Sequence, residues 1–354
     1  MRVLQVIDSL QVGGAERMAV NYANGLVGRI DGSYLCATRE EGDLKSEILE
    51  KVEYLFLNRR STLDFKAIRR LLKFIEHNKI TIIHAHGSSW FISAFAKMLS
   101  PGIKLVWHDH YGGSELLQTR PYARLIKVFK SRFDLVIAVN EKLEKWSKEF
   151  LNHPRVCYIG NFVDSLSRKH EWFTNQSLRI VCLANLRPQK NHLGLIKAFE
   201  QIGIKNQDIT LHLYGKNFAD AYFTQVVQAI KCSPFRERIF YHGVKVGISW
   251  RLKEFDIGVL FSISEGLPLA LLEYGMAGLP VVVTDVGQCG KVVGENGIVV
   301  PVGEVEAFAA AILETIENKE ESATRAIRLH EAIKMDYSKN AILTRVIDIY
   351  AKLD

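Results

Sequence analysis

Residues 264–280 read SEGLPLALLEYGMAGLP, which is a turn, an apolar segment and a second turn. The Gly-Leu-Pro turn predicts the start of a helix, because proline is tolerated in the first helical turn, where its missing N–H is no loss. The helix then covers residues 269–277, and Gly278 with Pro280 ends it before an apolar strand at residues 281–283.

Two glutamates lie eight residues apart in this segment, Glu265 in the turn and Glu273 in the helix. Glu273 is the only charge on the helix, so it either faces water or holds a polar partner, because an unpaired buried carboxylate is costly. Glu265 precedes the helix start, where free N–H groups and the positive end of the helix dipole attract phosphate. An anion site flanked by two hydrogen-bond acceptors predicts a nucleotide-sugar ligand. The alternative is an outward-facing helix residue and an ordinary loop acid.

Strand-like apolar runs alternate with helical patterns along the whole chain, which is typical of a parallel α/β architecture. Strands are expected at residues 3–7, 34–37, 54–57, 81–84, 104–108, 135–139, 156–159, 179–183, 210–214, 238–241, 257–261, 281–284 and 297–300. The polar segment Asp164–Gln176 is the expected linker, and 354 residues exceed the usual size of a single core. We therefore expect two Rossmann-like domains that face a central cleft, residues 1–165 and 166–330, followed by a terminal segment, 331–354.

Composition points to an ordinary globular protein. Hydrophobic residues make up 48% of the chain and charged residues 24%. The five cysteines form no CxxC pair and no metal-like spacing, which indicates reduced thiols in the cytosol. Neither a signal peptide nor a bilayer-spanning apolar run is expected, so the sequence predicts a soluble protein that at most sits on a membrane.

The net charge of +7 is concentrated in the first half, since residues 1–165 carry 24 Lys and Arg against 18 Asp and Glu. This excess favours an anionic partner, and a membrane surface fits better than nucleic acid, because no nucleic-acid-binding motif is present. The helix expected at residues 120–133 has an apolar face and basic residues elsewhere, and basic residues at 65–79 add to the same surface. Such a helix either lies on anionic lipid or packs as an ordinary Rossmann helix.

A glycine pair follows the first strand in the stretch DSLQVGGAER, residues 8–17. Gly13 and Gly14 let a substrate approach the backbone closely and expose N–H donors at a helix start. The spacing is not that of the dinucleotide-binding G-x-G-x-x-G loop. The pair is either a plain turn or part of a substrate-binding loop.

One strand of the first half ends in VWHDH, residues 106–110. His108 is a candidate for contact with substrate, although a single histidine is more often a satisfied structural residue. A zinc site would need further ligands, for which His84 and His86 qualify only if loops converge. We expect no bound metal, and the chain also lacks an Asp-x-Asp motif.

The strand that opens the second half is followed by ANLRPQKNH, residues 184–192. Arg187 and Lys190 suit a diphosphate, because arginine grips phosphate oxygens bidentately and lysine adds a point charge. The alternative is a pair of solvated loop cations.

The segment that holds Glu265 and Glu273 resembles the Glu-x7-Glu motif of the family 4 retaining glycosyltransferases of the GT-B fold, and the resemblance extends along nearly the whole chain. It implies that Glu265 contacts the transferred sugar and that Glu273 bonds the ribose hydroxyls. It also implies that His108 reaches the sugar from the acceptor side. The loop of Gly13 and Gly14 would lie against the donor phosphate and the acceptor.

The resemblance assigns the donor diphosphate to Lys190 and to the backbone at the helix start. That backbone belongs to Gly266, Leu267, Pro268 and Leu269. The chain departs from the family at Asn185, where the family usually has an arginine five residues before the lysine. Arg187 therefore occupies a shifted position.

The implied activity is transfer of a hexose from a UDP- or GDP-sugar to a glycan or lipid-linked acceptor, with retention and without a metal or other cofactor. The implied setting is bacterial surface polysaccharide synthesis, in the cytoplasm or on the inner face of its membrane. The leaving phosphate would accept the proton of the acceptor, and the final helix would pack back on the N-terminal domain. The alternatives are a catalytically silent sugar-nucleotide-binding subunit of an assembly complex and a nucleotide-sugar epimerase.

Overall fold

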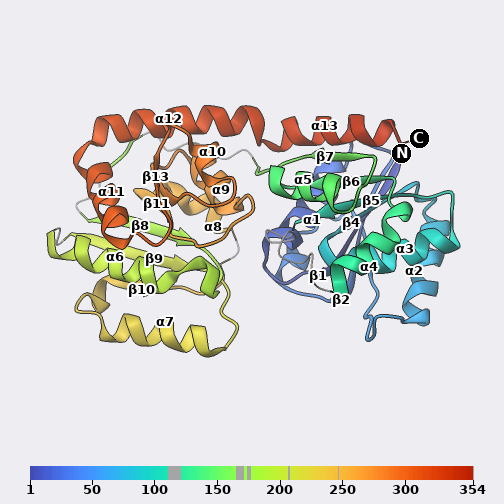
Figure 1. Ribbon diagram of the computed structural model, residues 1–354, viewed down its shortest axis with the longest axis horizontal. Coiled ribbons are helices and arrows are strands. Elements are labelled where there is room, and N and C mark those ends of the chain that lie inside the picture. Colours follow the sequence, from blue (N-terminus) through green and yellow to red (C-terminus); the bar gives the residue numbers. More distant parts are fainter. Residues whose placement is uncertain (111–120, 165–170, 174–176, 206–207, 246, 354) are drawn as a thin grey trace. The chain divides into compact units, whose positions relative to one another are not determined.

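The computed structural model describes residues 1–110, 121–164, 171–173, 177–205, 208–245 and 247–353. The chain divides into two compact units, Met1–Asn161 with Lys339–Asp354 and Phe162–Ser338. Each unit is a parallel sheet with helices on both faces (Figure 1). The α/β class predicted from the alternating pattern is confirmed.

The sheet of the first unit has the strand order β3-β2-β1-β4-β5-β6-β7. Its strands are β1 (Arg2–Ser9), β2 (Gly32–Glu40), β3 (Glu53–Phe56), β4 (Ile82–His86), β5 (Lys104–Asp109), β6 (Leu135–Ala138) and β7 (Val156–Tyr158). Its helices are α1 (Gly14–Leu26), α2 (Phe65–His77), α3 (Trp90–Leu99), α4 (Pro121–Phe129), α5 (Glu141–Glu149) and α13 (Lys339–Ala351). Side-chain caps start two of them: Asp64 accepts from the Ala67 N–H before α2, and Asn140 accepts from the Leu143 N–H before α5.

The two faces of this sheet differ in what covers them. Because side chains alternate along a strand, Leu4 and Val6 of β1 face the core formed with α2, α3 and α4. Ile7 belongs to the smaller core with α1 on the other face. Helix α13 packs against α1, where Leu343 lies so close to Gly25 that no larger residue fits without a shift.

The sheet of the second unit has the order β10-β9-β8-β11-β12-β13, the classical doubly wound arrangement. Its strands are β8 (Leu178–Leu183), β9 (Ile209–Tyr214), β10 (Ile239–Tyr241), β11 (Ile257–Leu260), β12 (Val281–Thr284) and β13 (Ile298–Val300). Its helices are α6 (His192–Lys205), α7 (Ala221–Cys232), α8 (Ile248–Arg251), α9 (Leu269–Ala277), α10 (Cys289–Val293), α11 (Val305–Glu317) and α12 (Lys319–Asp336). Ile180 and Val181 of β8 face opposite cores, one with α6 and α11 and the other with α9 and α12.

Helix α9 has the predicted bounds, and its ends explain them. Gly278 follows the last helical residue with φ +74°, a left-handed conformation that glycine adopts without strain. Pro268 is the N-cap in an extended conformation, so it stands just outside the helix and not in its first turn. Pro268 also has no N–H, so it adds no donor to the predicted anion site.

The boundaries between the units fall a few residues from those expected. Val163 pairs with Ser338, and its N–H donates to the Tyr337 carbonyl at 3.1 Å, so this segment already belongs to the second unit. The expected linker, Asp164–Gln176, lies mostly outside the described residues. Within it, the indole N–H of Trp172 donates to the Gly278 carbonyl at 2.7 Å, which attaches this part of the segment to the second unit.

The basic helix α4 packs as a Rossmann helix along one side. Ile126 is buried, and the Phe129 ring contacts Trp90 and Phe91 of α3. Val128 is 74% exposed on the same helix. The predicted residue Arg120 and the side chain of Tyr122 lie outside the described part of the structure. None of the described helices combines the length and the apolar character that crossing a membrane requires.

Candidate functional site

The carboxyl ends of β8, β11 and β12 carry loops that are hydrogen-bonded to one another. The Ile263 N–H after β11 donates to the Gln189 carbonyl after β8 at 2.8 Å. Thr284 at the end of β12 donates its hydroxyl to the Ser262 carbonyl at 2.6 Å. The loops with Lys190 and Glu265 are therefore held together at the edge of the sheet where open α/β folds bind ligands.

Gly287, which is not among the predicted site residues, fixes the Glu265 loop. Gly287 has φ +59°, and a Cβ at this position would lie 2.3 Å from the Glu265 carbonyl oxygen and 2.4 Å from that of Gly266. The next residue, Gln288, donates its N–H to the Gly266 carbonyl at 2.9 Å. Only glycine allows this close approach of two backbones. Gly287 lies just after the strand predicted at residues 281–284, and a glycine at the carboxyl end of a strand could have marked it as a candidate site residue.

Lys190 and Glu265, 75 residues apart in sequence, form an ion pair. The Lys190 Nζ lies 2.6 Å from each Glu265 carboxylate oxygen, and Ser262 donates its hydroxyl to Glu265 Oε1 at 2.7 Å. The Glu265 side chain is only 6% exposed and that of Lys190 22%. The site thus offers a cation and a carboxylate acceptor side by side, ahead of the N-terminus of α9.

Glu273 lies in the second turn of α9, half-buried, and accepts a hydrogen bond from the Ser249 hydroxyl at 2.6 Å. Of the two predicted alternatives, a residue facing water or one with a polar partner, the second is correct. Ser249 belongs to α8, so a short helix elsewhere in the unit orients this carboxylate.

The Arg187 side chain contacts the Phe218 ring and does not take part in the Lys190–Glu265 ion pair. Its guanidinium lies over the Phe218 ring at 4.4 Å, and Lys216 lies over the same ring at 5.7 Å. Asn185, which stands where the family has arginine, accepts from the Lys216 N–H at 2.9 Å and so ties the loops after β8 and β9 together.

Gly13 and Gly14 lie in the first unit at the start of α1. Gly13 is the extended N-cap and its carbonyl accepts from the Arg17 N–H at 2.9 Å. Gly14 is exposed, with no neighbour among the described residues within 4 Å of where a Cβ would stand. This open backbone leaves room for a ligand at the helix start.

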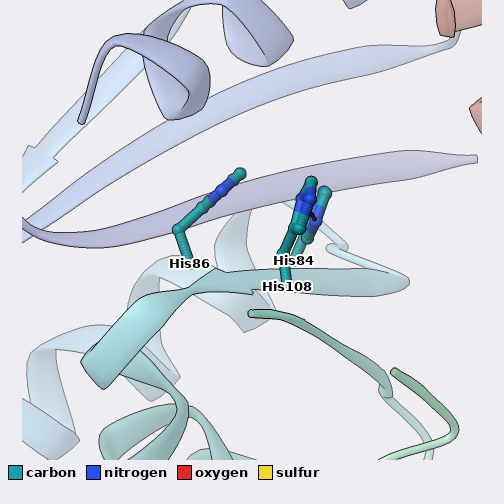
Figure 2. A group of neighbouring side chains, drawn as sticks. All are labelled: His84, His86 and His108. Carbon is teal, nitrogen blue, oxygen red and sulfur yellow. Dashed lines mark hydrogen bonds between the residues drawn. The ribbon is translucent and has the colours of Figure 1, made fainter. Parts of the chain in front are cut away.

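His108 lies in a cluster of four histidines in the first unit. The residues His84, His86, His108 and His110 come from β4 and the end of β5, and His86 is directly opposite His108 in the parallel ladder. Figure 2 shows three of these side chains extending to the same side of the sheet. Strand β4 continues two residues beyond its predicted end, so His86 belongs to the strand and no convergence of loops is needed. Two His-x-His patterns on consecutive strands were the signal for this cluster.

The rings of the cluster meet as two hydrogen-bonded pairs. His84 Nε2 lies 3.0 Å from His108 Nδ1, and His86 Nδ1 lies 2.8 Å from His110 Nε2. The ring centroids are 5.0 Å and 5.1 Å apart in near-parallel planes, so the rings of each pair meet edge to edge.

This arrangement fits a metal poorly, although nitrogen atoms of His84, His86 and His108 lie within 4.8 Å of one another. Zinc needs lone pairs that converge on one point about 2.0–2.1 Å from each nitrogen. In each pair the two nitrogens instead point at each other across a hydrogen-bond distance, so a metal would lie far from the lone-pair axes. The geometry is that of shared protons.

Burial keeps the cluster neutral. His84, His86 and His108 are inaccessible to solvent, and desolvation lowers the pKa of each well below that of free histidine. The same cause lowers the pKa of His110 to about 3. Each ring therefore has one N–H donor and one bare acceptor nitrogen near pH 7.

Both halves of the chain match sequence profiles of glycosyltransferases. The sequence profile of "Glycosyltransferase Family 4" matches residues 12–165, and that of "Glycosyl transferases group 1" matches residues 177–318. The chain is 24% identical over 332 residues to the O-antigen biosynthesis glycosyltransferase WbnH of Escherichia coli, covering 91% of this chain and 93% of that protein. It is 25% identical over 321 residues to the UDP-Gal:alpha-D-GlcNAc-diphosphoundecaprenol alpha-1,3-galactosyltransferase of E. coli, covering 82% and 81%.

Among solved structures, HepE from Anabaena in complex with UDP and glucose superposes with a TM-score of 0.84. The two chains are 19% identical, and 99% of each is covered, so this likeness concerns the fold. The two profiles together account for most of both units. The chain belongs to the family 4 glycosyltransferases of the GT-B fold.

Proposed function

We propose that the chain transfers a sugar from a UDP-sugar to a glycan or lipid-linked acceptor, with retention of the anomeric configuration. The observation that carries this proposal is the ion pair of Lys190 with Glu265 ahead of α9, with Glu273 in the second turn of that helix. A sugar diphosphate bound beside the pair meets a cation for its phosphate and a carboxylate for its sugar hydroxyls. The helix N-terminus adds further stabilisation of negative charge.

The roles of the individual residues follow from these contacts and from the family resemblance. Lys190, helped by Arg187 and by the backbone of Gly266, Leu267 and Leu269, holds the diphosphate. Glu265 binds the transferred sugar, and Glu273 binds the ribose. Gly13, Gly14 and His108 serve the acceptor end.

The names of the relatives support the choice of substrates. One is named for UDP-Gal and a diphosphoundecaprenol-linked acceptor, and another for O-antigen synthesis. A UDP-hexose and a lipid-linked glycan in surface polysaccharide synthesis are the donor and acceptor that we assign here. Such an acceptor places the enzyme on the inner face of the cytoplasmic membrane, where the basic residues of α2 and α4 would face anionic lipid.

Nucleotide binding tests the donor site directly. UDP at a hundred times its Kd should stabilise the nucleotide-binding unit by about 2.7 kcal/mol. That corresponds to a rise in Tm of about 5–10 °C for a unit of this size. GDP and ADP should give smaller shifts. In the variant Glu273→Ala the UDP shift should disappear, because the ribose hydroxyls lose their acceptor.

Ser249→Ala is the matched control, since it removes one hydrogen bond to Glu273 and leaves the carboxylate in place. It should keep the UDP shift. An undiminished shift in Glu273→Ala would contradict the ribose role of Glu273, and no shift with any nucleotide would contradict the proposed donor site. Conversion of the donor without any acceptor would identify an epimerase.

Chelation tests the proposal that no metal takes part. Excess EDTA should leave the transfer rate unchanged, because Lys190, Arg187 and the α9 N-terminus offset the charge of the leaving diphosphate. The measurement is transfer to acceptor with and without EDTA, followed by added Mg²⁺ or Mn²⁺. A loss with EDTA that either ion restores would contradict metal independence.

A further inference from the structure

A hydrogen-bond chain runs from the C-terminal helix to His108. The Tyr350 hydroxyl of α13 lies 2.5 Å from His84 Nδ1, and His84 Nε2 lies 3.0 Å from His108 Nδ1. Tyr350 is fully buried although it is 266 residues from His84 in sequence. At the far end of the chain, His108 Nε2 is buried and has no hydrogen-bond partner among the described residues.

The direction of the protons in this chain follows from the donor at its start. Tyr350 is fully buried, and the acceptor that its hydroxyl contacts among the described residues is His84 Nδ1, so the phenol donates to this atom; the reverse bond would leave the buried phenol proton without an acceptor. Burial also raises the pKa of Tyr350, so the phenol keeps its proton. Neutral His84 then carries its own proton on Nε2 and donates to His108 Nδ1. Neutral His108 must therefore carry its proton on Nε2, the atom left without a partner.

The ring protons of the second pair, His86 with His110, can be assigned without reference to Tyr350. Gln5 Oε1 lies 2.8 Å from His86 Nε2, and an amide oxygen can only accept, so His86 Nδ1 accepts in turn from His110 Nε2. The rings of His108 and His110 stack with centroids 4.0 Å apart. Both pairs thus have fixed tautomers, and the stacking fixes the orientation of the His108 ring.

We propose that Tyr350 and His84 are positioning residues that fix His108 as the tautomer with a proton on Nε2. His108 then offers a hydrogen-bond donor to an oxygen of the substrate. The assignment of that oxygen to the sugar rests on the proposed function. A histidine in this tautomer orients and polarises the sugar, but it cannot act as the general base. The proton of the acceptor hydroxyl must go elsewhere, in accord with its proposed transfer to the leaving phosphate.

The tautomer can be measured on the free, full-length protein. Long-range ¹H–¹⁵N NMR of ¹⁵N-histidine-labelled protein near pH 7 distinguishes protonated from bare ring nitrogens, and His108→Gln identifies the signals of His108. Nε2 of His108 should be protonated and Nδ1 bare. A proton on Nδ1 would overturn the proposal, and this result needs no variant of Tyr350.

Tyr350→Phe removes the first donor of the chain. His84 should then place its proton on Nδ1 in part of the molecules, and the Nε2 signal of His108 should shift toward that of a bare nitrogen. The transfer kcat should fall about tenfold, the effect of one hydrogen bond in the transition state, with KM for the nucleotide-sugar nearly unchanged. Unchanged His108 signals in Tyr350→Phe would remove Tyr350 from the chain.

Tyr34→Phe is the matched control. Tyr34 is a buried tyrosine of the same unit whose hydroxyl accepts from Arg2 and whose ring packs against Phe74 of α2. This variant should lose stability as Tyr350→Phe does, while the His108 signals and kcat stay those of the native protein. UDP binding distinguishes a failure of this proposal from a failure of the proposed function. If the His108 tautomer is as expected but UDP gives no rise in Tm, the proposed function is contradicted and the hydrogen-bond chain from Tyr350 to His108 is still supported.

Discussion

Glu265→Gln should lower the rate of sugar transfer by about 10²–10³-fold, the effect of removing one electrostatic group aimed at the reacting centre. Glutamine has nearly the same shape and keeps an oxygen for the Ser262 hydroxyl. It has lost the charge that bonds the sugar hydroxyls in the proposed complex. Lys190 loses its partner in the same variant and becomes fully available to the diphosphate.

UDP should therefore still raise the Tm of Glu265→Gln by as much as it does in the native protein. Lys190→Ala should behave differently, because it removes the cation from the diphosphate and leaves a nearly buried carboxylate unpaired. That variant should lose both UDP binding and stability. Joint loss of transfer and UDP binding in Glu265→Gln would contradict the separate sugar role of Glu265.

Glu254→Gln is the control for the loss of one negative charge in the same unit. Glu254 forms ion pairs at the surface with Arg251, at 2.8 Å, and with Arg179, at 3.9 Å. Its replacement should change neither the transfer rate nor the UDP shift, since surface pairs contribute little.

The first unit should lose most of its stability between pH 7 and pH 5. Its four clustered histidines have folded pKa values below that of unfolded histidine, which is about 6.5. As the pH falls below about 6.5, the unfolded state takes up protons that the folded state cannot bind. The stability is thus complete above pH 6.5 and is lost progressively toward the folded pKa, which for His110 is about 3.

The magnitude is large because four groups act together. Each histidine that is protonated only in the unfolded state lowers the free energy of unfolding by about 1.4 kcal/mol per pH unit. Between pH 7 and pH 5 this is roughly 2 kcal/mol per histidine, and four together approach the whole stability of a typical domain. Scanning calorimetry between pH 5 and pH 8, with the two units fitted as separate transitions, gives the slope.

Two variants make this measurement specific. His110→Gln removes one member of the cluster and should reduce the slope by about 1.4 kcal/mol per pH unit. His77→Gln changes an exposed histidine in the last turn of α2 and should leave the slope as it is. A free energy of unfolding that stays constant from pH 7 to pH 5 would show that the cluster is not kept neutral. The same pH dependence of this free energy in His110→Gln and His77→Gln would show the same.

Several features of the fold and the site were predictable because their causes are local. The bounds of α9 follow from Pro268 and Gly278, whose backbone preferences hold in any context. Glu265 and Glu273 stood out because a carboxylate beside a helix start or within an apolar helix needs a chemical reason. The predicted strands occur because apolar runs between turns form strands in this architecture, and only their ends moved, as at His86.

The sequence by itself determined the alternating elements and the two sheets, and it supplied the residues that we propose for the chemistry. Only the tertiary structure decided which of these residues meet: Lys190 with Glu265, Glu273 with Ser249, and Tyr350 with His84. Such partnerships depend on which strands are neighbours and in what register, and no local pattern encodes that. Burial then set the protonation of the histidines, because the cost of charging a ring depends on the water removed around it by the whole unit.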